Sequence, residues 1–321
     1  MNNILIITQK VSQDDPILGF FHRWLIEFSH NYKHIVVICL EKDKFNLPSN
    51  VKVVSLGKEA GQNKIKYIFN FYKYIWRERK DYDHVFVHMN PIYVLLGGLL
   101  FKILQKKVYL WYTHKRVNWS LVLAEKIVDK IFTASSESLR LKTDKKVVTG
   151  HGIDTQLFKP NFEIKKENIF LTVGRISEVK NDIKMLRLVK QRPDFKLRFI
   201  GSPVTTADEI YFKKLKQAIV DEGLENNVEF IGNCSQDKLP YFYQKAKVFI
   251  NFSDTGSVDK AVLEALAVNI PTLTTNEAFA DNYPVYQDLD EALSSSNETR
   301  AFVETNHSLS NLIHKLKNQM S

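Results

Sequence analysis

The sequence predicts an α/β protein of two domains, each with a parallel β-sheet covered by helices. Its 321 residues are about twice the length of an ordinary domain. Short apolar segments rich in β-branched residues alternate with segments of helical periodicity along the whole chain. A polar, irregular stretch at residues 160–168 separates two such series, so we expect the linker there.

The expected strands follow from the apolar segments. In the first series they are Ile4–Thr8, Ile35–Leu40, Val51–Ser55, His84–His88, Val108–Tyr112, Lys130–Thr133 and Lys146–Thr149. In the second series they are Ile169–Val173, Phe195–Ile200, Val228–Gly232, Val248–Phe252 and Thr272–Thr275. Helices are expected in most of the intervals, and Glu291–Met320 is expected to be mostly helical.

Composition excludes several classes of protein. With 44% hydrophobic and 25% charged residues, the chain is not expected to be disordered. Its two cysteines, Cys39 and Cys234, exclude a disulfide framework and fit a reducing cytosol. No signal peptide precedes the first strand, and the longest apolar stretch, Pro91–Phe101, is too short to span a bilayer. We therefore expect a soluble protein or one peripheral to a membrane.

The net charge of +9 is unevenly placed. Up to Pro160 there are 25 Lys and Arg against 14 Asp and Glu, whereas the rest has 20 against 22. A basic first half indicates an acidic partner such as anionic lipid, nucleic acid or an anionic glycan, or it serves solubility alone. No nucleic-acid-binding motif is present, so nucleic acid is not the expected partner.

Residues 63–80 are expected to form a helix with two apolar stripes. The stripe expected to face the core comprises Ile65, Ile68, Phe69, Tyr72, Ile75 and Trp76. The opposite face carries Tyr67, Phe71 and Tyr74, flanked by Lys66, Lys73 and Arg77. Aromatic and basic side chains on one outer face suit an anionic membrane surface or a groove for a lipid-linked acceptor. The alternative is that another helix covers this face.

Two segments predict an anion site. The strand that ends near Phe252 is followed by a polar turn and by a helix that Pro271 terminates. A helix that starts just beyond a strand's carboxyl end offers backbone N–H groups to anions. In the other segment, Arg175 and Lys180 bracket a loop that leads into a helix from Asp182. A guanidinium, an ammonium and a helix N-terminus together suit a diphosphate without a metal, and no metal is predicted.

These segments resemble the motifs of family 4 glycosyltransferases (glycosyl transferases group 1 type), which have the GT-B fold. Residues 264–267 with Ile270 and Pro271 resemble the second half of the family signature, Glu, seven residues, then Glu. Gly256 stands in place of the first glutamate. Residues 147–160 resemble Asn-Gly-Val-Asp-x-x-x-Phe-x-Pro, with His151 in place of Asn. Residues 174–181 resemble Gly-Arg-x-x-x-x-Lys-Gly, with Asn181 in place of the last Gly.

The resemblance implies a GT-B architecture of two Rossmann-like domains whose parallel sheets face a central cleft. Residues 1–160 would bind the acceptor and residues 161–300 the nucleotide sugar. A C-terminal helix at residues 301–321 would cross back to pack on the first domain. The implied activity is a retaining, metal-independent hexosyl transfer from a UDP-, GDP- or ADP-sugar, with no cofactor. The implied acceptor is a glycan or a lipid-linked molecule in cell-surface polysaccharide or glycoconjugate synthesis.

The resemblance also implies roles for individual residues. Gly174, Arg175 and Lys180 would hold the donor diphosphate, and Gly19, in the loop after the first strand, would lie close to it. Glu264 would accept hydrogen bonds from the ribose hydroxyls.

The transferred sugar would meet the remaining residues. His114, after the strand that begins at Val108, would lie beside it, and the turn with Gly256 and Ser257 would meet it through backbone N–H groups. Asp259 would take over the missing glutamate's contact, and Lys260 would add positive charge toward the phosphates. The candidate catalytic residues are therefore His114, Asp259 and Glu264.

Three other readings stay open. The loss of the first glutamate is consistent with a distinct donor or with a non-catalytic sugar-nucleotide or glycan-binding protein. A GT-B sugar-nucleotide epimerase would interconvert a donor without an acceptor, and a basic nucleic-acid binder would bind any polyanion in a salt-sensitive way. The expected location is the cytoplasm, either free or peripheral on the inner face of the membrane.

Overall fold

A computed structural model describes residues 2–15, 17–280, 282–295 and 298–320. The chain folds into two compact α/β units. The first unit comprises the chain up to Gly152 together with the segment from Ser308, and the second comprises Ile153–His307.

The first unit contains a parallel sheet of seven strands in the order β3-β2-β1-β4-β5-β6-β7. The strands are β1 (Asn3–Val11), β2 (His34–Lys42), β3 (Val51–Ser55), β4 (His84–His88), β5 (Lys107–Trp111), β6 (Lys130–Thr133) and β7 (Lys146–Val148). The helices are α1 (Gly19–Asn31), α2 (Lys64–Arg77), α3 (Pro91–Ile103), α4 (Trp119–Glu125) and α11 (Leu309–Met320). The central strands are buried on both faces, as in other parallel sheets.

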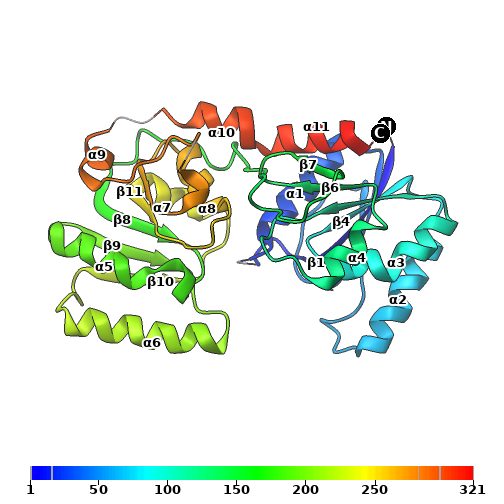
Figure 1. Cartoon of the computed structure of the whole chain (residues 1–321), viewed down its shortest axis with the longest axis horizontal. Coiled ribbons are helices and arrows are strands. Elements are labelled where there is room, and N and C mark those ends of the chain that lie inside the picture. Colours follow the sequence, from blue (N-terminus) through cyan, green and yellow to red (C-terminus); the bar gives the residue numbers. More distant parts are fainter. Residues whose placement is uncertain (1, 16, 281, 296–297, 321) are drawn as a thin grey trace. The chain divides into compact units, whose positions relative to one another are not determined.

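Two cores lie on the two faces of this sheet. Helices α1 and α11 cover one face, where Trp24, Phe28 and Ile313 are buried. Helices α2, α3 and α4 cover the other face, where Phe71 and Phe101 are buried (Figure 1).

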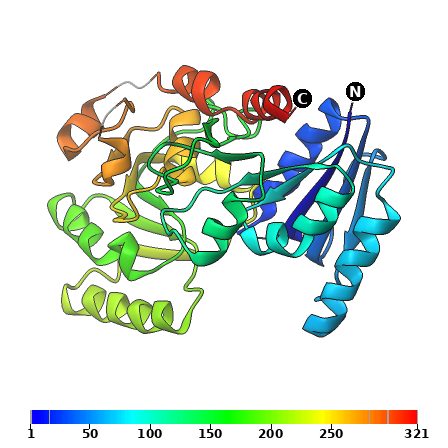
Figure 2. The same ribbon diagram turned by 45° about the vertical axis from the view of Figure 1, so that its right-hand side comes forward.

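The C-terminal helix belongs to the first unit, as Figure 2 shows for α11 beside α1. The hydroxyl of Tyr109 donates to the Met320 carbonyl at 3.2 Å, and Lys130 Nζ donates to the Gln319 carbonyl at 2.8 Å. The helical prediction for Glu291–Met320 corresponds to three helices, and residues 296 and 297 of that stretch lie outside the described residues.

The second unit contains a parallel sheet of five strands in the order β10-β9-β8-β11-β12. The strands are β8 (Glu167–Val173), β9 (Lys196–Ile200), β10 (Val228–Gly232), β11 (Ala246–Asn251) and β12 (Thr272–Thr274). The helices are η1 (Glu178–Lys180), α5 (Asp182–Gln191), α6 (Thr206–Asp221), α7 (Leu239–Lys245), α8 (Lys260–Ala267), η2 (Glu277–Phe279), α9 (Leu289–Ser294) and α10 (Arg300–His307). All twelve expected strands are confirmed, with small differences at their ends.

The boundary between the units lies at Gly152 and Ile153 rather than at Pro160. The segment that follows packs into the hydrophobic core of the second unit, where Ile153 and Phe158 are fully buried. Its backbone is also bonded there, because Ile153 N–H donates to the His307 carbonyl at 2.7 Å and the Arg300 guanidinium donates to the Phe158 carbonyl at 2.8 Å.

The interpretation of helix α2 was wrong about which face is buried. Phe71 lies in the core, where its ring stacks against Tyr93 of α3 with 5.8 Å between ring centroids. Tyr67 and Tyr74 are half-buried against the same core. Of the stripe expected to be buried, Ile75 is buried as predicted, but the others are partly or largely exposed, as Phe69 (59%) and Trp76 (53%) illustrate. The reason is tertiary, because α3 packs against the Phe71 side of α2.

The three basic residues of the predicted surface stay on the outside of α2. Lys66 and Lys73 are exposed, and Lys66 Nζ lies 5.3 Å from the centroid of the exposed Phe69 ring. The Arg77 guanidinium lies 5.0 Å from the centroid of the Tyr74 ring. Across the described part of the chain, every helix is too short or too polar to span a bilayer.

Candidate functional site

The candidate site lies where the second sheet reverses its strand order, between β8 and β11. These neighbouring parallel strands are followed by residues 174–181 and 252–259, so both segments lie at the carboxyl edge of the sheet. Open α/β sheets bind their ligands at such a switch point. Both segments that predicted an anion site are therefore brought together.

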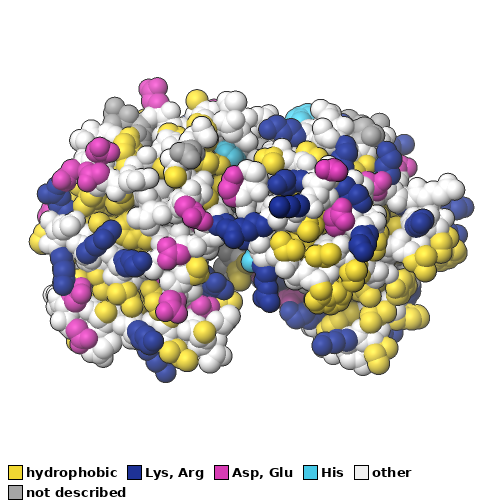
Figure 3. Space-filling model, viewed as in Figure 1, with side chains coloured by type: hydrophobic (Ala, Val, Ile, Leu, Met, Phe, Trp, Pro, Cys, Tyr) yellow, Lys and Arg dark blue, Asp and Glu magenta, His cyan; other side chains and the backbone are white. Residues whose placement is uncertain are grey.

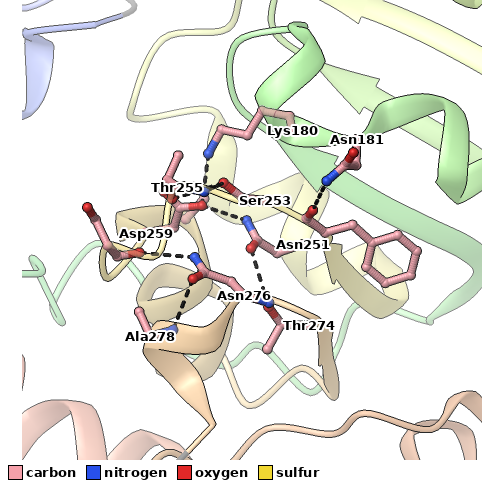
Figure 4. A network of polar contacts seen from close by, with 12 residues as sticks. Lys180, Asn181, Asn251, Ser253, Thr255, Asp259, Thr274, Asn276 and Ala278 are labelled. Carbon is pink, nitrogen blue, oxygen red and sulfur yellow. Dashed lines mark hydrogen bonds and ion pairs between the residues drawn. The ribbon is translucent and has the colours of Figure 1, made fainter. Parts of the chain in front are cut away.

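A polar network joins the two segments (Figure 4). Lys180 Nζ lies 2.8 Å from Asp259 Oδ2, and the Asn251 amide donates to the same oxygen at 2.9 Å. Thr274 at the end of β12 donates its hydroxyl to Asn251 Oδ1 at 3.3 Å. The Lys180 and Asp259 side chains are mostly buried, with 19% and 16% exposed. The Asp259 carboxylate therefore binds Lys180 and Asn251 instead of capping α8.

The turn after β11 is held in shape by its own side chains and by its neighbours. The Asn276 amide donates to the Ser257 carbonyl at 3.0 Å, and the Asn181 amide donates to the Phe252 carbonyl at 2.9 Å. Gly256 has a φ of +55°, a conformation that residues with side chains rarely adopt. A glutamate at position 256 would strain the backbone. The positive φ of Gly256 therefore explains why glycine stands here in place of the signature glutamate.

Asn181 also departs from the family pattern, and its conformation explains the substitution. It has a φ of +54°, in the left-handed region. Glycine and asparagine are the residues that adopt this region most readily. Asn181 therefore keeps the backbone turn that leads into α5 and adds a hydrogen bond to the turn after β11.

Gly174 and Arg175 follow β8 directly and are exposed. A Cβ built on Gly174 would lie 3.8 Å from Lys180 Cε, so the glycine backbone runs alongside the lysine side chain. The neighbouring Gly201 is required by close approach, because a Cβ there would lie 1.9 Å from the Gly174 carbonyl oxygen. Gly201 was not among the residues predicted from the sequence.

The Arg175 guanidinium is available to a ligand. Its Nε lies 3.8 Å from Asp208 Oδ2, which is a long contact, and its side chain is 45% exposed. The Asp208 carboxylate already accepts backbone N–H groups from Val204 and Thr205 as part of a capping box. The guanidinium therefore keeps most of its donors for another anion.

Glu264 is buried within the second unit rather than lying at an open surface. Its side chain is 4% exposed, its Oε2 accepts from the Tyr243 hydroxyl at 3.1 Å, and its Oε1 lies 3.4 Å from Lys260 Nζ. Burial raises the pKa of the Glu264 carboxyl, and the Lys260 ammonium and the Tyr243 hydroxyl oppose this. Burial lowers the pKa of the Lys260 ammonium, which the Glu264 charge opposes. The positive charge of Lys260 therefore compensates the negative charge of the buried Glu264 carboxylate.

A second buried carboxyl lies at the start of α5. Asp182 is 3% exposed and accepts the backbone N–H of Ser177 at 3.1 Å. Burial raises the pKa of Asp182 from 3.8 to about 7, although the Ser177 N–H and the nearby Lys180 charge work against the shift.

Gly19 and His114 lie in the first unit, at the carboxyl ends of β1 and β5. Strand β4 separates these two strands in the sheet. Gly19 is the first residue of α1, and its N–H donates to the Asp15 carbonyl at 2.9 Å. His114 is exposed, and its Nδ1 accepts the Arg116 N–H at 3.0 Å. This bond leaves the proton of the neutral ring on Nε2, which then serves as a donor.

Three polar residues of the site were not predicted from the sequence, namely Asn251, Thr274 and Tyr243. Asn251 ends the apolar strand β11, and a polar residue that closes an apolar run was a usable signal. Tyr243 lies on α7 in an aromatic stretch that reads as core, so no local signal pointed to its contact with Glu264.

Comparisons with known proteins agree with this arrangement. HepE from Anabaena, solved with UDP and glucose, has a TM-score of 0.78 and 14% identity over 100% of this chain and 99% of that chain. Sucrose-phosphate synthase from Thermosynechococcus elongatus has a TM-score of 0.75 and 14% identity over 99% and 98%. UDP-GlcNAc 2-epimerase from Methanocaldococcus jannaschii has a TM-score of 0.57 and 13% identity over 99% of both chains.

These likenesses confirm the predicted GT-B fold, and at such low identity they show the fold alone. No curated protein sequence matches the chain. The family model for glycosyl transferases group 1 matches residues 154–316, which is half of the chain and includes the whole second-unit site. The chain therefore belongs to the glycosyl transferases group 1 family.

Proposed function

We propose that this chain is a retaining glycosyltransferase of family 4. It transfers a sugar from a nucleoside-diphosphate sugar to a glycan or lipid-linked acceptor in the synthesis of a cell-surface polysaccharide or glycoconjugate. The observation that carries this proposal is the pairing of an available guanidinium, Arg175, with the ammonium of Lys180 at the switch point of the second sheet.

In the proposed reaction the acceptor hydroxyl attacks the anomeric carbon on the face that the diphosphate leaves. The bond from that carbon to the diphosphate oxygen breaks, the new glycosidic bond forms, and the acceptor proton passes to the leaving phosphate oxygen. Arg175 and Lys180 stabilise the negative charge that grows on the diphosphate, so the step is proposed to need no metal and no cofactor.

Asp259 is proposed to act on the sugar. Its Oδ2 already binds Lys180 and Asn251, which fix the carboxylate at the carboxyl edge of the sheet. Its other oxygen is proposed to accept a hydroxyl of the transferred sugar. Glu264 is proposed to accept hydrogen bonds from the ribose hydroxyls, and its contacts with Tyr243 and Lys260 hold the carboxylate in one orientation. His114 of the first unit is proposed to lie beside the transferred sugar.

The nucleotide is proposed to be UDP, with GDP and ADP as the alternatives. The support is that the HepE structures hold UDP with glucose and UDP-glucose. A thermal-shift titration with the three nucleotides tests the donor site. We expect UDP to raise the melting temperature of the wild type. At a hundredfold excess over Kd, binding stabilises the folded state by about 2.7 kcal/mol.

Lys180→Ala is expected to abolish this shift, because it removes one of the two cations that face the diphosphate. The matched control is Lys184→Ala, which removes an exposed charge from α5, the helix that follows Lys180. The control should respond to UDP like the wild type. A wild type that responds to none of the three nucleotides, or an unchanged response in Lys180→Ala, would contradict the proposed donor site.

The second candidate function is binding of a sugar nucleotide or glycan without transfer. The observation that favours it is Gly256, which replaces a signature glutamate and has a backbone that disfavours one. Release of UDP from UDP-sugars, assayed with and without a mixture of glycan and lipid-linked acceptors, separates the candidates. Acceptor-dependent release with the donor's anomeric configuration in the product supports the transferase. Binding without release supports the second candidate, and conversion of the donor without an acceptor indicates an epimerase.

The protein is proposed to act in the cytoplasm, at the inner face of the membrane. Its two cysteines, Cys39 and Cys234, are both free and lie in different units, which fits a reducing compartment.

A further inference from the structure

The outer faces of α2, α3 and α4 carry an unusual number of exposed apolar side chains. The six largest exposures are Ile65 (80%), Phe69 (59%), Trp76 (53%), Leu99 (74%), Ile103 (66%) and Trp119 (67%). We call this surface the α2–α4 face. Large exposed apolar patches mark interaction surfaces, since isolated apolar residues are common on proteins and contiguous ones are rare.

The three helices form one continuous surface. Helix α2 is fixed to α3, because the Tyr72 hydroxyl donates to the Leu96 carbonyl at 2.7 Å and Phe71 stacks on Tyr93. Helix α3 packs directly against α4. Figure 3 shows hydrophobic side chains gathered over these helices, with Lys and Arg among them and around them.

The charge of this region is as distinctive as its apolar character. Residues 64–130 contain 13 Lys and Arg against 5 Asp and Glu, a net charge of +8 where the whole chain carries +9. Neither Lys64–Arg77 nor Pro91–Ile103 contains an acidic residue. The segment of the chain that contains the α2–α4 face therefore carries a net charge close to that of the whole chain.

A basic cavity of about 500 Å³ adjoins the apolar residues. It is lined by Lys102, Lys106, Lys107 and Lys126, next to Leu99 and Ile127. Lys106 Nζ donates to the Tyr82 carbonyl, so its position is fixed. The cavity's carboxylate, Asp129, accepts the backbone N–H of Val108 at 2.7 Å. The other three lysines thus face a space large enough for a phosphate headgroup.

We propose that the α2–α4 face binds the surface of an anionic phospholipid bilayer, with Lys102, Lys107 and Lys126 holding a lipid phosphate in the basic cavity. Charge complementarity selects this occupant. Tryptophan, leucine and isoleucine enter the boundary between headgroups and acyl chains, while lysines reach the anionic headgroups. A second copy of the chain would bring the same positive charge against itself.

The proposal names the surface for the peripheral location proposed above, but it uses different residues from those that the sequence suggested. Only Lys66, Lys73 and Arg77 remain from the predicted surface, since Phe71 is buried and Tyr67 and Tyr74 are half-buried. The apolar contact comes instead from exposed residues of α3 and α4 and from three residues of α2 that were expected to face the core, Ile65, Phe69 and Trp76.

Vesicle binding of the full chain tests the proposal. The assay is co-sedimentation with phosphatidylcholine vesicles, with and without about one third phosphatidylglycerol. The wild type should bind the anionic vesicles and not the neutral ones. Substitution of Phe69, Trp76 and Leu99 together by serine should lower the partition coefficient at least a hundredfold. Because these side chains are exposed, the melting temperature should stay close to that of the wild type.

A matched control removes three exposed apolar side chains elsewhere. Phe162→Ser, Ile210→Ser and Val220→Ser lie in the second unit, where the three side chains are 93%, 54% and 55% exposed. This control should bind anionic vesicles like the wild type. Equal binding by the two triple variants, or the absence of binding by the wild type, would overturn the proposal.

The lysine cavity has its own pair of variants. Lys102→Gln with Lys126→Gln should weaken binding roughly tenfold or more, since each lysine near an anionic surface contributes substantially. Lys213→Gln with Lys214→Gln, on the exposed side of α6, changes the net charge equally and should have little effect. Equal losses in both pairs would show attraction by net charge alone and overturn the cavity's role.

Light scattering excludes the competing occupant. A dimer of the wild type that the Phe69, Trp76 and Leu99 substitutions dissociate, without any vesicle binding, would show that this face joins two copies and would overturn the membrane proposal. Vesicle binding is measured without donor, and the UDP-induced thermal shift is measured without vesicles. Failure of the membrane proposal and failure of the donor-site proposal are therefore distinguished.

Discussion

Helix α2 of the first unit and the turn before α8 of the second unit were both singled out from the sequence, with opposite results. In the turn, Asp259 lies 2.8 Å from Lys180 at the carboxyl edge of the sheet, where the strand pattern had placed both. In α2 the buried residues are Phe71, which was expected outside, and Ile75, which was expected in the core, while the rest of the expected core stripe is exposed. Strand direction determines where a polar turn lies, whereas a helix with two apolar stripes can bury either one.

The largest expected effect tests the assignment of the α2 faces. Phe71→Ala should lower the free energy of unfolding by about 3–5 kcal/mol, because it leaves a cavity against Tyr93. Trp76→Ala, on the exposed face, should change it by about 0.5 kcal/mol or less. Urea unfolding of both variants provides the measurement. A larger loss in Trp76→Ala than in Phe71→Ala would restore the faces expected from the sequence.

The next prediction concerns the buried carboxyl beside the second-unit site. The pKa of Asp182 is about 7 in the folded state and 3.8 in the unfolded reference, so the folded state binds the proton more tightly. The stability this proton contributes is present below about pH 4 and is lost as the pH rises through 7.

Asp182→Asn keeps an oxygen for the Ser177 N–H but does not ionise. Relative to the wild type, the variant should therefore gain stability between pH 4 and pH 7, by up to ~4 kcal/mol. Urea unfolding of both proteins across this pH range gives the difference in free energy. A difference that stays constant with pH would mean that Asp182 is ionised in the folded protein at all these pH values.

The third prediction separates sugar contact from phosphate contact within the turn. Asp259→Asn removes a negative charge beside the diphosphate site, so the affinity for UDP should stay the same or rise. Turnover should fall about a hundredfold, which corresponds to ~2.7 kcal/mol, because the sugar hydroxyl loses its acceptor.

Lys180→Ala should instead lower both UDP affinity and turnover. Calorimetric titration with UDP and steady-state kinetics with the donor distinguish the two patterns. Weaker UDP binding by Asp259→Asn together with unchanged kcat would assign Asp259 to the positioning of Lys180 alone.

The strands and the order of the elements could be read from the sequence, because parallel strands are buried on both faces and appear as short apolar runs such as Ile4–Thr8. The C-terminal helix shows the same advantage. Leu309, Leu312, Ile313 and Leu316 follow a single helical stripe, and all four are buried. A single stripe leaves one choice of buried face, so local periodicity was sufficient there.

The candidate site was predicted in part for the same reason. Arg175 and Lys180 follow one strand and Asp259 follows its neighbour, so the sheet brings them to one edge. The contacts that these residues make with their partners were not predictable. Asn251 and Thr274 donate to the network across strands, and Tyr243 reaches Glu264 from α7.

The sequence by itself therefore determined the alternation of strands and helices, the family, and the polar residues that follow the strands of the second sheet. These depend on short-range periodicity and on motifs that stay together along the chain. The tertiary structure decided which face of α2 is buried, that Glu264 is enclosed by Tyr243 and Lys260, and that Ile153–Pro160 belongs to the second unit. Each of these depends on packing between segments that are distant in sequence, and local pattern carries no information about such neighbours.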